Sequence, residues 1–129
     1  MEIRYDKGGG LLPVIIQDAT TNEVLMLGFM NPEALEATRR AGEVVFFSRT
    51  RNRLWKKGER SGHVLKLREM RIDCDADALL MKVEAIGPGV CHEGYRSCFF
   101  RKLDDDGNCA TVDERTFDPA RVYPQESSR

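Results

Sequence analysis

Three aspartates and three of the four cysteines lie between residues 73 and 98, with types and spacing that suit metal binding. Asp73, Asp75 and Asp77 alternate along the chain, and Cys74 lies between the first two. In an extended strand, residues i, i+2 and i+4 share a face, so the carboxylates would line up and the thiol would point away. Neighbours on such a face are about 6.6–6.8 Å apart, so a single Mg²⁺ needs a curved chain or bridging waters. Clustered aspartates also mark turns and strand ends that hold no metal.

The cysteines are spaced differently from those of a structural zinc site. Cys91 follows Cys74 by 17 positions and Cys98 follows Cys91 by 7, so the paired C-x-x-C spacing of a zinc ribbon is missing. Three thiol ligands and a water would instead form an open catalytic site, where zinc lowers the pKa of the water towards ~7 and supplies a hydroxide nucleophile. Isolated cysteines are often inert core residues, which fits Cys98 beside two phenylalanines better than Cys91.

The two histidines are candidate proton carriers. His92 directly follows Cys91, and the ordinary imidazole pKa of ~6.5 suits proton transfer near neutral pH. We expect His92 to move protons at the metal site. His63 is the second candidate, either for that role or for a phosphate contact. Cys109 follows a turn and is not expected to take part.

Positive charge is concentrated in residues 49–71. The whole chain has 20 Lys and Arg against 21 Asp and Glu, which argues against a general nucleic-acid-binding or membrane-surface protein. Residues 49–71 nevertheless contain nine basic and two acidic side chains, a net charge of +7. Such a run is often only a solvated face. The alternative is a small, strongly anionic ligand held locally, which the embedded Trp55 and Gly58 favour.

Length and composition match one ordinary domain. The chain has 129 residues, of which 41% are hydrophobic, enough to furnish one core. No apolar run approaches the ~20 residues of a membrane helix, and the first residues lack the layout of a signal peptide. We therefore expect a cytoplasmic protein with reduced thiols, forming a single domain over residues 1–129 with a frayed tail at 125–129.

The apolar pattern predicts a strand-dominated α+β fold with one clear helix. Apolar runs at 12–17 and 24–29 flank a polar loop and predict a hairpin. Asn31 as the cap, a proline in the first turn and Gly42 beyond the end predict a helix over 32–41.

The rest of the chain contains further strand patterns. They are expected at 44–48, 54–57, 64–73, 78–86 and 98–103. Within 64–73 the apolar residues change parity, which predicts a bulge near Arg68 and Glu69. The acidic stretch at 104–108 predicts a turn with a solvated tip.

Several motifs occur in the order found in the phosphoribosyl-AMP cyclohydrolase family, which the chain resembles over roughly residues 12–101. The shared motifs are QD (17–18), EVLML (23–27), FMN (29–31), FSR (47–49), LWKKGERSGH (54–63), DCDADALL (73–80), GP (87–88) and CHEGYRSCF (91–99). Two departures concern local packing: Phe47 replaces a tryptophan of many relatives, and the Gly89–Val90 segment is one residue longer than in some.

The resemblance implies a hydrolase of histidine biosynthesis that adds water across the N1–C6 bond of the adenine ring in 1-(5-phosphoribosyl)-AMP. The product is the formimino-carboxamide ribotide. The resemblance also implies an intertwined homodimer with one Zn²⁺ per subunit, shared across the interface, and a Mg²⁺ site. The implied ligands are Asp73, Asp75 and Asp77 for Mg²⁺, and Cys74 of one subunit with Cys91 and Cys98 of the partner subunit for Zn²⁺. At this length we expect no fused phosphoribosyl-ATP pyrophosphohydrolase domain, which some relatives carry.

The substrate of this family carries two phosphates, which gives the basic residues 49–71 a partner. The candidate phosphate contacts are Arg49, Lys57 and the backbone near Gly58, Ser61 and Gly62. Trp55 is a candidate for stacking on the purine, although a buried structural tryptophan explains it equally well.

Three other functions fit parts of the pattern. A zinc-stabilised module that binds a nucleotide or RNA would need a fourth ligand, such as His92 or Cys109, and several aromatics for base stacking, whereas only Trp55 lies in the basic segment. A zinc nucleobase deaminase would need H-x-E and P-C-x-x-C motifs, which are absent. Cysteines used purely for packing would bind no metal.

Overall fold

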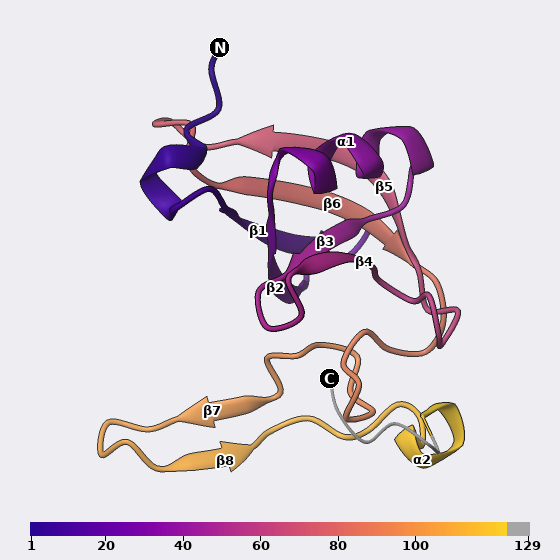
Figure 1. The fold of residues 1–129 in the computed structure, drawn as a ribbon. Coiled ribbons are helices and arrows are strands. Elements are labelled where there is room, and N and C mark those ends of the chain that lie inside the picture. The colour runs from indigo at the N-terminus through magenta and orange to yellow at the C-terminus, as the bar shows by residue number, and fades with distance from the viewer. Residues whose placement is uncertain (124–129) are drawn as a thin grey trace.

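A four-stranded mixed sheet forms the centre of the computed structural model, which describes residues 1–123 (Figure 1). Across the sheet the strands are β2 (Val24–Met30), β1 (Leu12–Asp18), β6 (Leu79–Ala85) and β5 (Leu65–Ile72). β1 pairs antiparallel with β2 and parallel with β6, while β5 pairs antiparallel with β6. The expected tail at 125–129 lies outside the described residues.

The antiparallel pairing of β1 with β2 confirms the hairpin predicted from the apolar runs at 12–17 and 24–29. Leu12, Val14 and Ile16 are fully buried and the residues between them are less so, as a strand with one face on the core requires. In β5 the pairing register shifts between Leu67 and Glu69, which confirms the predicted bulge.

Helix α1 (Pro32–Ala41) has the predicted bounds because both of its ends are capped locally. The Ala34 N–H donates to the Asn31 side chain over 2.8 Å, and the Gly42 N–H donates to the Thr38 carbonyl with Gly42 at φ 69°. The buried Thr38 hydroxyl also accepts from the Val45 N–H, which ties the helix to the next strand. Among residues 1–123, no helix is long and apolar enough to cross a bilayer.

A short ribbon of β3 (Val45–Ser48) and β4 (Arg53–Lys56) follows the helix, close to two of the predicted strands. The Val44 carbonyl accepts from Lys57, and the Val44 N–H donates to the Leu65 carbonyl, so the ribbon is connected to β5. Figure 1 shows the ribbon and α1 on the same side of the sheet. The ribbon and the loop after it therefore carry the first part of the basic segment beside the sheet, whereas residues 65–71 of that segment belong to β5 within the sheet.

The part of the described chain that follows β6 lies below the sheet in Figure 1 and is hydrogen-bonded to β2 through Cys98. It contains β7 (Arg101–Leu103), β8 (Cys109–Thr111) and the short helix α2 (Pro119–Val122), drawn at the bottom of Figure 1. The predicted strand at 98–103 is wrong for its first three residues, because the Cys98 N–H donates to Leu25 of β2 and holds them in an irregular segment. β8, α2 and the 3₁₀ helix η1 (Tyr5–Gly8) were not predicted, whereas the turn at 104–108 is confirmed between β7 and β8.

Candidate metal and substrate site

Residues 90–100, here called the thiol segment, have neither helix nor strand and bring Cys91 and Cys98 together. The Cys98 thiol hydrogen-bonds to the sulfur of Cys91. The segment turns tightly between them: the Cys91 N–H donates to the Tyr95 carbonyl and the Gly94 N–H to the Cys91 carbonyl, each over 3.0 Å. Gly94 has φ +97°, a conformation that side-chain-bearing residues rarely adopt. Cys91 is only 3% exposed.

The surroundings of Cys91 favour a thiolate. The hydrogen bond from Cys98 is the largest influence on its pKa, which is lowered from 9.0 to about 6. Burial opposes this shift, whereas the Glu93 N–H, 3.4 Å from Sγ, and the positive charge of Lys57 support it. Thiolate sulfur is the form that binds Zn²⁺, so the chemistry of this donor pair fits that metal.

Cys74 does not join this pair within the chain. It is exposed and lies in the connection between β5 and β6. In residues 1–123, the only group of three or more candidate ligand side chains with atoms within 4.8 Å of one another consists of aspartates. The structure therefore brings together two of the three predicted thiol ligands.

The three aspartates of that group are Asp73, Asp75 and Asp77. The chain over these residues is curved, as a shared cation was expected to require, because the Asp73 carboxylate accepts from the N–H groups of Asp77 (3.0 Å) and Ala78 (3.2 Å). Ala76 has a positive φ of 63° within this turn. The curvature that a shared cation would need is thus present, and it gathers the carboxylates more closely than a flat strand face allows.

A lysine ammonium already lies against the aspartates. The Lys7 side chain, from η1, places Nζ 3.0 Å from Asp75 Oδ2 and 2.8 Å from Asp77 Oδ2. Hydrogen bonds to Asp77 and Asp75 raise the pKa of Lys7 above its ordinary value. The ammonium acts as a stand-in cation, and oxygen donors of this kind fit Mg²⁺.

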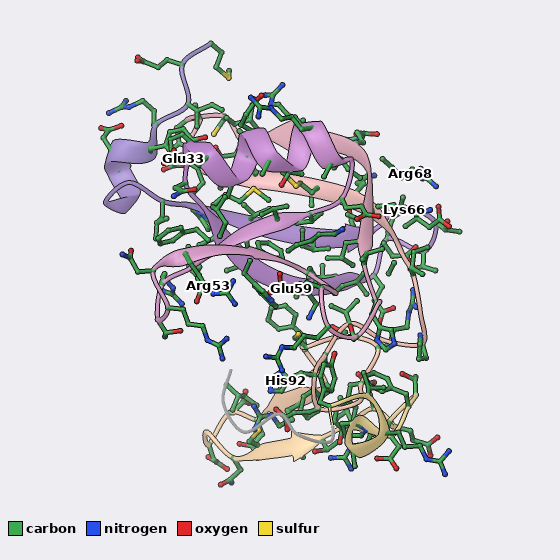
Figure 2. The ribbon with its side chains drawn as sticks, turned by 45° about the vertical axis from the view of Figure 1, so that its right-hand side comes forward. Glu33, Arg53, Glu59, Lys66, Arg68 and His92 are labelled. Atoms are coloured by element: carbon green, nitrogen blue, oxygen red, sulfur yellow. The ribbon has the colours of Figure 1, made fainter. Side chains whose placement is uncertain are left out.

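A cavity of about 260 Å³ lies between the β3–β4 ribbon and the thiol segment. Its walls are Ser48, Arg51, Arg53, Trp55, Lys57, Gly58, Glu59, Arg60, Ser61, His92 and Tyr123. Figure 2 shows Arg53 and Glu59 on the upper side of this region and His92 below them. Five predicted site residues are in this lining: Trp55, Lys57, Gly58, Ser61 and His92.

The cavity and the thiols are neighbours. His92, adjacent in the chain to Cys91, lines the cavity, and the charge of Lys57 acts on the Cys91 sulfur. Lys57 is 5% exposed, with Nζ 5.4 Å from the Trp55 ring centre, and Trp55 also packs against Phe46. A ligand in this cavity would therefore contact buried positive charge close to a sulfur pair.

Three predicted residues lie outside the cavity lining. The Arg49 guanidinium stacks over the Phe29 ring at 3.9 Å. His63 places Nδ1 3.1 Å from the Gly89 carbonyl oxygen, and its ring lies edge-on to Phe117. Gly62, at φ +79°, forms part of the turn that precedes His63. Each of these has a packing or turn role that sequence reasoning did not assign.

Six lining residues were missed from the sequence: Ser48, Arg51, Arg53, Glu59, Arg60 and Tyr123. The three arginines belong to the basic segment, so its charge was a signal that could have identified them. Tyr123 is far along the chain from the motifs and carries no local signal.

The comparisons with known proteins all match this chain to the same family. The family model for phosphoribosyl-AMP cyclohydrolase matches residues 26–100. The phosphoribosyl-AMP cyclohydrolase of Solibacter usitatus is 51% identical over 127 residues, which cover 98% of this chain and 100% of that protein. Proteins of the same name from Nitratidesulfovibrio vulgaris (strain DP4) and Desulforapulum autotrophicum are 51% and 49% identical, covering 92% and 95% of this chain and 94% and 98% of theirs.

Proposed function

Because the chain belongs to the phosphoribosyl-AMP cyclohydrolase family and so has that activity in histidine biosynthesis, we propose that it opens the purine ring with a water activated by thiol-bound zinc. The bond broken is N1–C6 of the adenine ring, and the product is the formimino-carboxamide ribotide. Family membership decides against the nucleotide-binding module and the deaminase considered above. The single-domain organisation of residues 1–129 and the cytoplasmic location stay predictions.

The observation that carries the zinc proposal is the Cys91–Cys98 pair beside the cavity. Cys91 and Cys98 would hold the metal with Cys74, leaving one position open for water. Zinc bound in this way supplies a water acidic enough to act as a nucleophile near neutral pH. The low pKa of Cys91 supports the proposal, since less free energy is needed to deprotonate this ligand.

We assign the third thiol to a second subunit. Cys74 lies outside the Cys91–Cys98 pair in one chain, so a symmetric homodimer in which each chain lends Cys74 to the other would complete two sites. Exposed apolar side chains in the C-terminal part support an intertwined dimer: Phe99 is 58% and Leu103 is 70% exposed.

Proton transfer is assigned to His92. Addition of water at C6 forms a C–O bond and breaks an O–H bond, and expulsion of N1 then breaks the N1–C6 bond. N1 must gain a proton as it leaves, and the water must lose one. His92 lines the cavity beside Cys91, from where its imidazole can accept the first proton and deliver it to N1. His63, outside the lining, remains the second candidate.

The cavity walls orient the substrate. Lys57 and the arginines on the walls supply positive charge for the two phosphates, with the backbone near Gly58 and Ser61 as hydrogen-bond donors. Trp55 offers a flat surface for the purine. We keep Arg49 and Gly62 as contacts only for a substrate that extends beyond the cavity.

Asp73, Asp75 and Asp77 would hold Mg²⁺ as a second, separate metal. Its binding requires Lys7 to leave Asp75 and Asp77, because the ammonium and the metal would compete for the same oxygens.

An ultraviolet assay of ring opening on phosphoribosyl-AMP, with and without a zinc chelator, tests the proposal. We expect turnover that the chelator abolishes and added Zn²⁺ restores. Turnover that persists in chelated, metal-free enzyme would contradict the zinc mechanism while leaving the family assignment intact.

A further inference from the structure

Arg96 connects the thiol segment to a distant turn of the sheet. Its Nε donates to Glu23 Oε1 over 2.6 Å and its Nη2 to Asp18 Oδ2 over 2.7 Å. Asp18 ends β1 and Glu23 precedes β2, so one guanidinium spans both sides of the β1–β2 turn. Two charge-assisted hydrogen bonds in a fixed fork give an arginine a well-defined orientation.

The turn that receives Arg96 is itself rigidly built. Asp18 is 8% exposed, and its Oδ1 accepts from the N–H groups of Thr20 (2.8 Å) and Thr21 (2.9 Å). The Asp18 N–H donates to the Glu23 carbonyl over 2.8 Å, which closes the turn. Burial opposes ionisation of Asp18, but the hydrogen bonds from Thr21, Thr20 and Arg96 outweigh it and keep its pKa below the ordinary value. Arg96 therefore meets a fixed carboxylate.

Backbone contacts hold the thiol segment on both sides of Arg96, and Arg96 itself makes the first of them. Its carbonyl accepts from the N–H of Val90, the residue before Cys91, over 3.0 Å. On the other side, the Ser97 hydroxyl donates to the Val24 carbonyl and the Cys98 N–H to the Leu25 carbonyl, each over 2.8 Å. The segment has no regular secondary structure, so the separation of the two thiols depends on contacts of this kind.

We propose that Arg96, anchored by Asp18 and Glu23, is a positioning residue that holds Cys91 and Cys98 at the spacing required to bind Zn²⁺. The inference rests on the zinc site proposed above and adds the residue that determines its geometry. Side chains behind the ligands commonly have this effect, and their loss weakens metal binding by about 10- to 100-fold.

The test compares Arg96→Gln with wild type as metal-free, reduced full-length proteins. The dissociation constant for Zn²⁺ is measured by competition with a chromophoric chelator, and the site geometry by the absorption spectrum of bound Co²⁺. We expect Arg96→Gln to bind Zn²⁺ about 10- to 100-fold more weakly with an altered Co²⁺ spectrum. Arg96→Lys should recover part of the affinity, since it keeps the charge without the fork.

Arg40→Gln is the matched control, because Arg40 pairs with Glu36 on the exposed face of α1 and should not affect the thiols. The melting temperature of each metal-free protein separates positioning from general stability. A lower melting temperature of Arg96→Gln with unchanged Zn²⁺ affinity and Co²⁺ spectrum would overturn the inference. Wild type that binds no Zn²⁺ would instead overturn the proposed zinc site.

Glu23→Gln serves where Arg96→Gln does not fold. It removes one carboxylate of the anchor and leaves the buried Asp18 contact in place. We expect a smaller but measurable loss of Zn²⁺ affinity, and wild-type affinity in this variant would also overturn the inference.

Discussion

The Cys98 thiol hydrogen-bonds to the sulfur of Cys91, and this contact is the main reason that the Cys91 pKa lies near 6. Six residues separate the two cysteines, and a turn closed by the Cys91 and Gly94 N–H groups brings them together. The pair lies beside a cavity lined by His92 and Lys57. The proposed zinc site would therefore lie next to the cavity in which we propose that the phosphorylated purine binds.

The Cys91 pKa predicts how the metal-free protein responds to pH. Its folded pKa of about 6 is below the ordinary 9.0, so the thiolate stabilises the fold fully above pH 9 and loses this contribution as pH falls towards 6. We expect the free energy of unfolding of metal-free wild type, minus that of Cys91→Ser, to decrease over this range. Thiolate absorbance in the ultraviolet should titrate near pH 6. A difference that does not vary with pH would contradict the shifted pKa.

Mixing two inactive variants tests whether the zinc site is shared between subunits. Cys74→Ser and Cys91→Ser each damage a different part of the site, so both homodimers should be inactive. If Cys74 completes the site of the partner subunit, each mixed dimer contains one intact site. Random reassociation after co-refolding then restores about a quarter of wild-type activity. No recovery, in a mixture shown to contain heterodimers, would place all three thiols in one chain, and a Cys74→Ser homodimer that is active by itself would remove Cys74 from the site.

Replacement of His92 separates proton transfer from metal binding. We expect His92→Ala to keep its zinc and to slow kcat by about 10²- to 10⁴-fold, the usual cost of losing a general acid–base group. His63→Ala is the comparison, because His63 contacts Gly89 and Phe117 outside the cavity lining. It should reduce kcat less. A near-wild-type rate for His92→Ala would move the role to His63 or to solvent.

Asp75→Asn tests whether the two metals occupy separate sites. The change removes one charge from the aspartate cluster, so more Mg²⁺ should be needed for half-maximal activity while the zinc content stays at the wild-type level. Asp105→Asn, in the exposed turn between β7 and β8, is the control and should change neither property. Loss of zinc from Asp75→Asn would show that the aspartates and the thiols do not form two separate metal sites.

The parts of the fold set by neighbouring residues were predictable from the sequence. Both ends of α1 follow from caps within a few residues, Asn31 and Gly42. The bulge in β5 follows from a change of parity that its own apolar residues display. The candidate metal ligands were equally predictable from the sequence. Cysteine and aspartate side chains are common metal ligands, and the motifs that contain them are long.

Contacts between distant residues were not predictable in this way. Arg96 meets Asp18 across 78 positions, and Lys7 meets Asp75 across 68. Neither arginine nor lysine carries a signal that identifies its carboxylate partner. The strand predicted from residue 98 fails for the same reason, since the bond from the Cys98 N–H to Leu25 overrides the local β-propensity of two phenylalanines.

Titration of metal-free enzyme with Zn²⁺ tests whether ring opening requires thiol-bound zinc. Zinc content and the rate of phosphoribosyl-AMP hydrolysis are measured on the same samples of wild type, Cys91→Ser and Cys109→Ser. We predict that activity rises in proportion to bound zinc and levels off near one ion per chain in wild type and Cys109→Ser, while Cys91→Ser gains neither. Full activity in Cys91→Ser, or in wild type without zinc, would show that thiol-bound zinc is not required for ring opening.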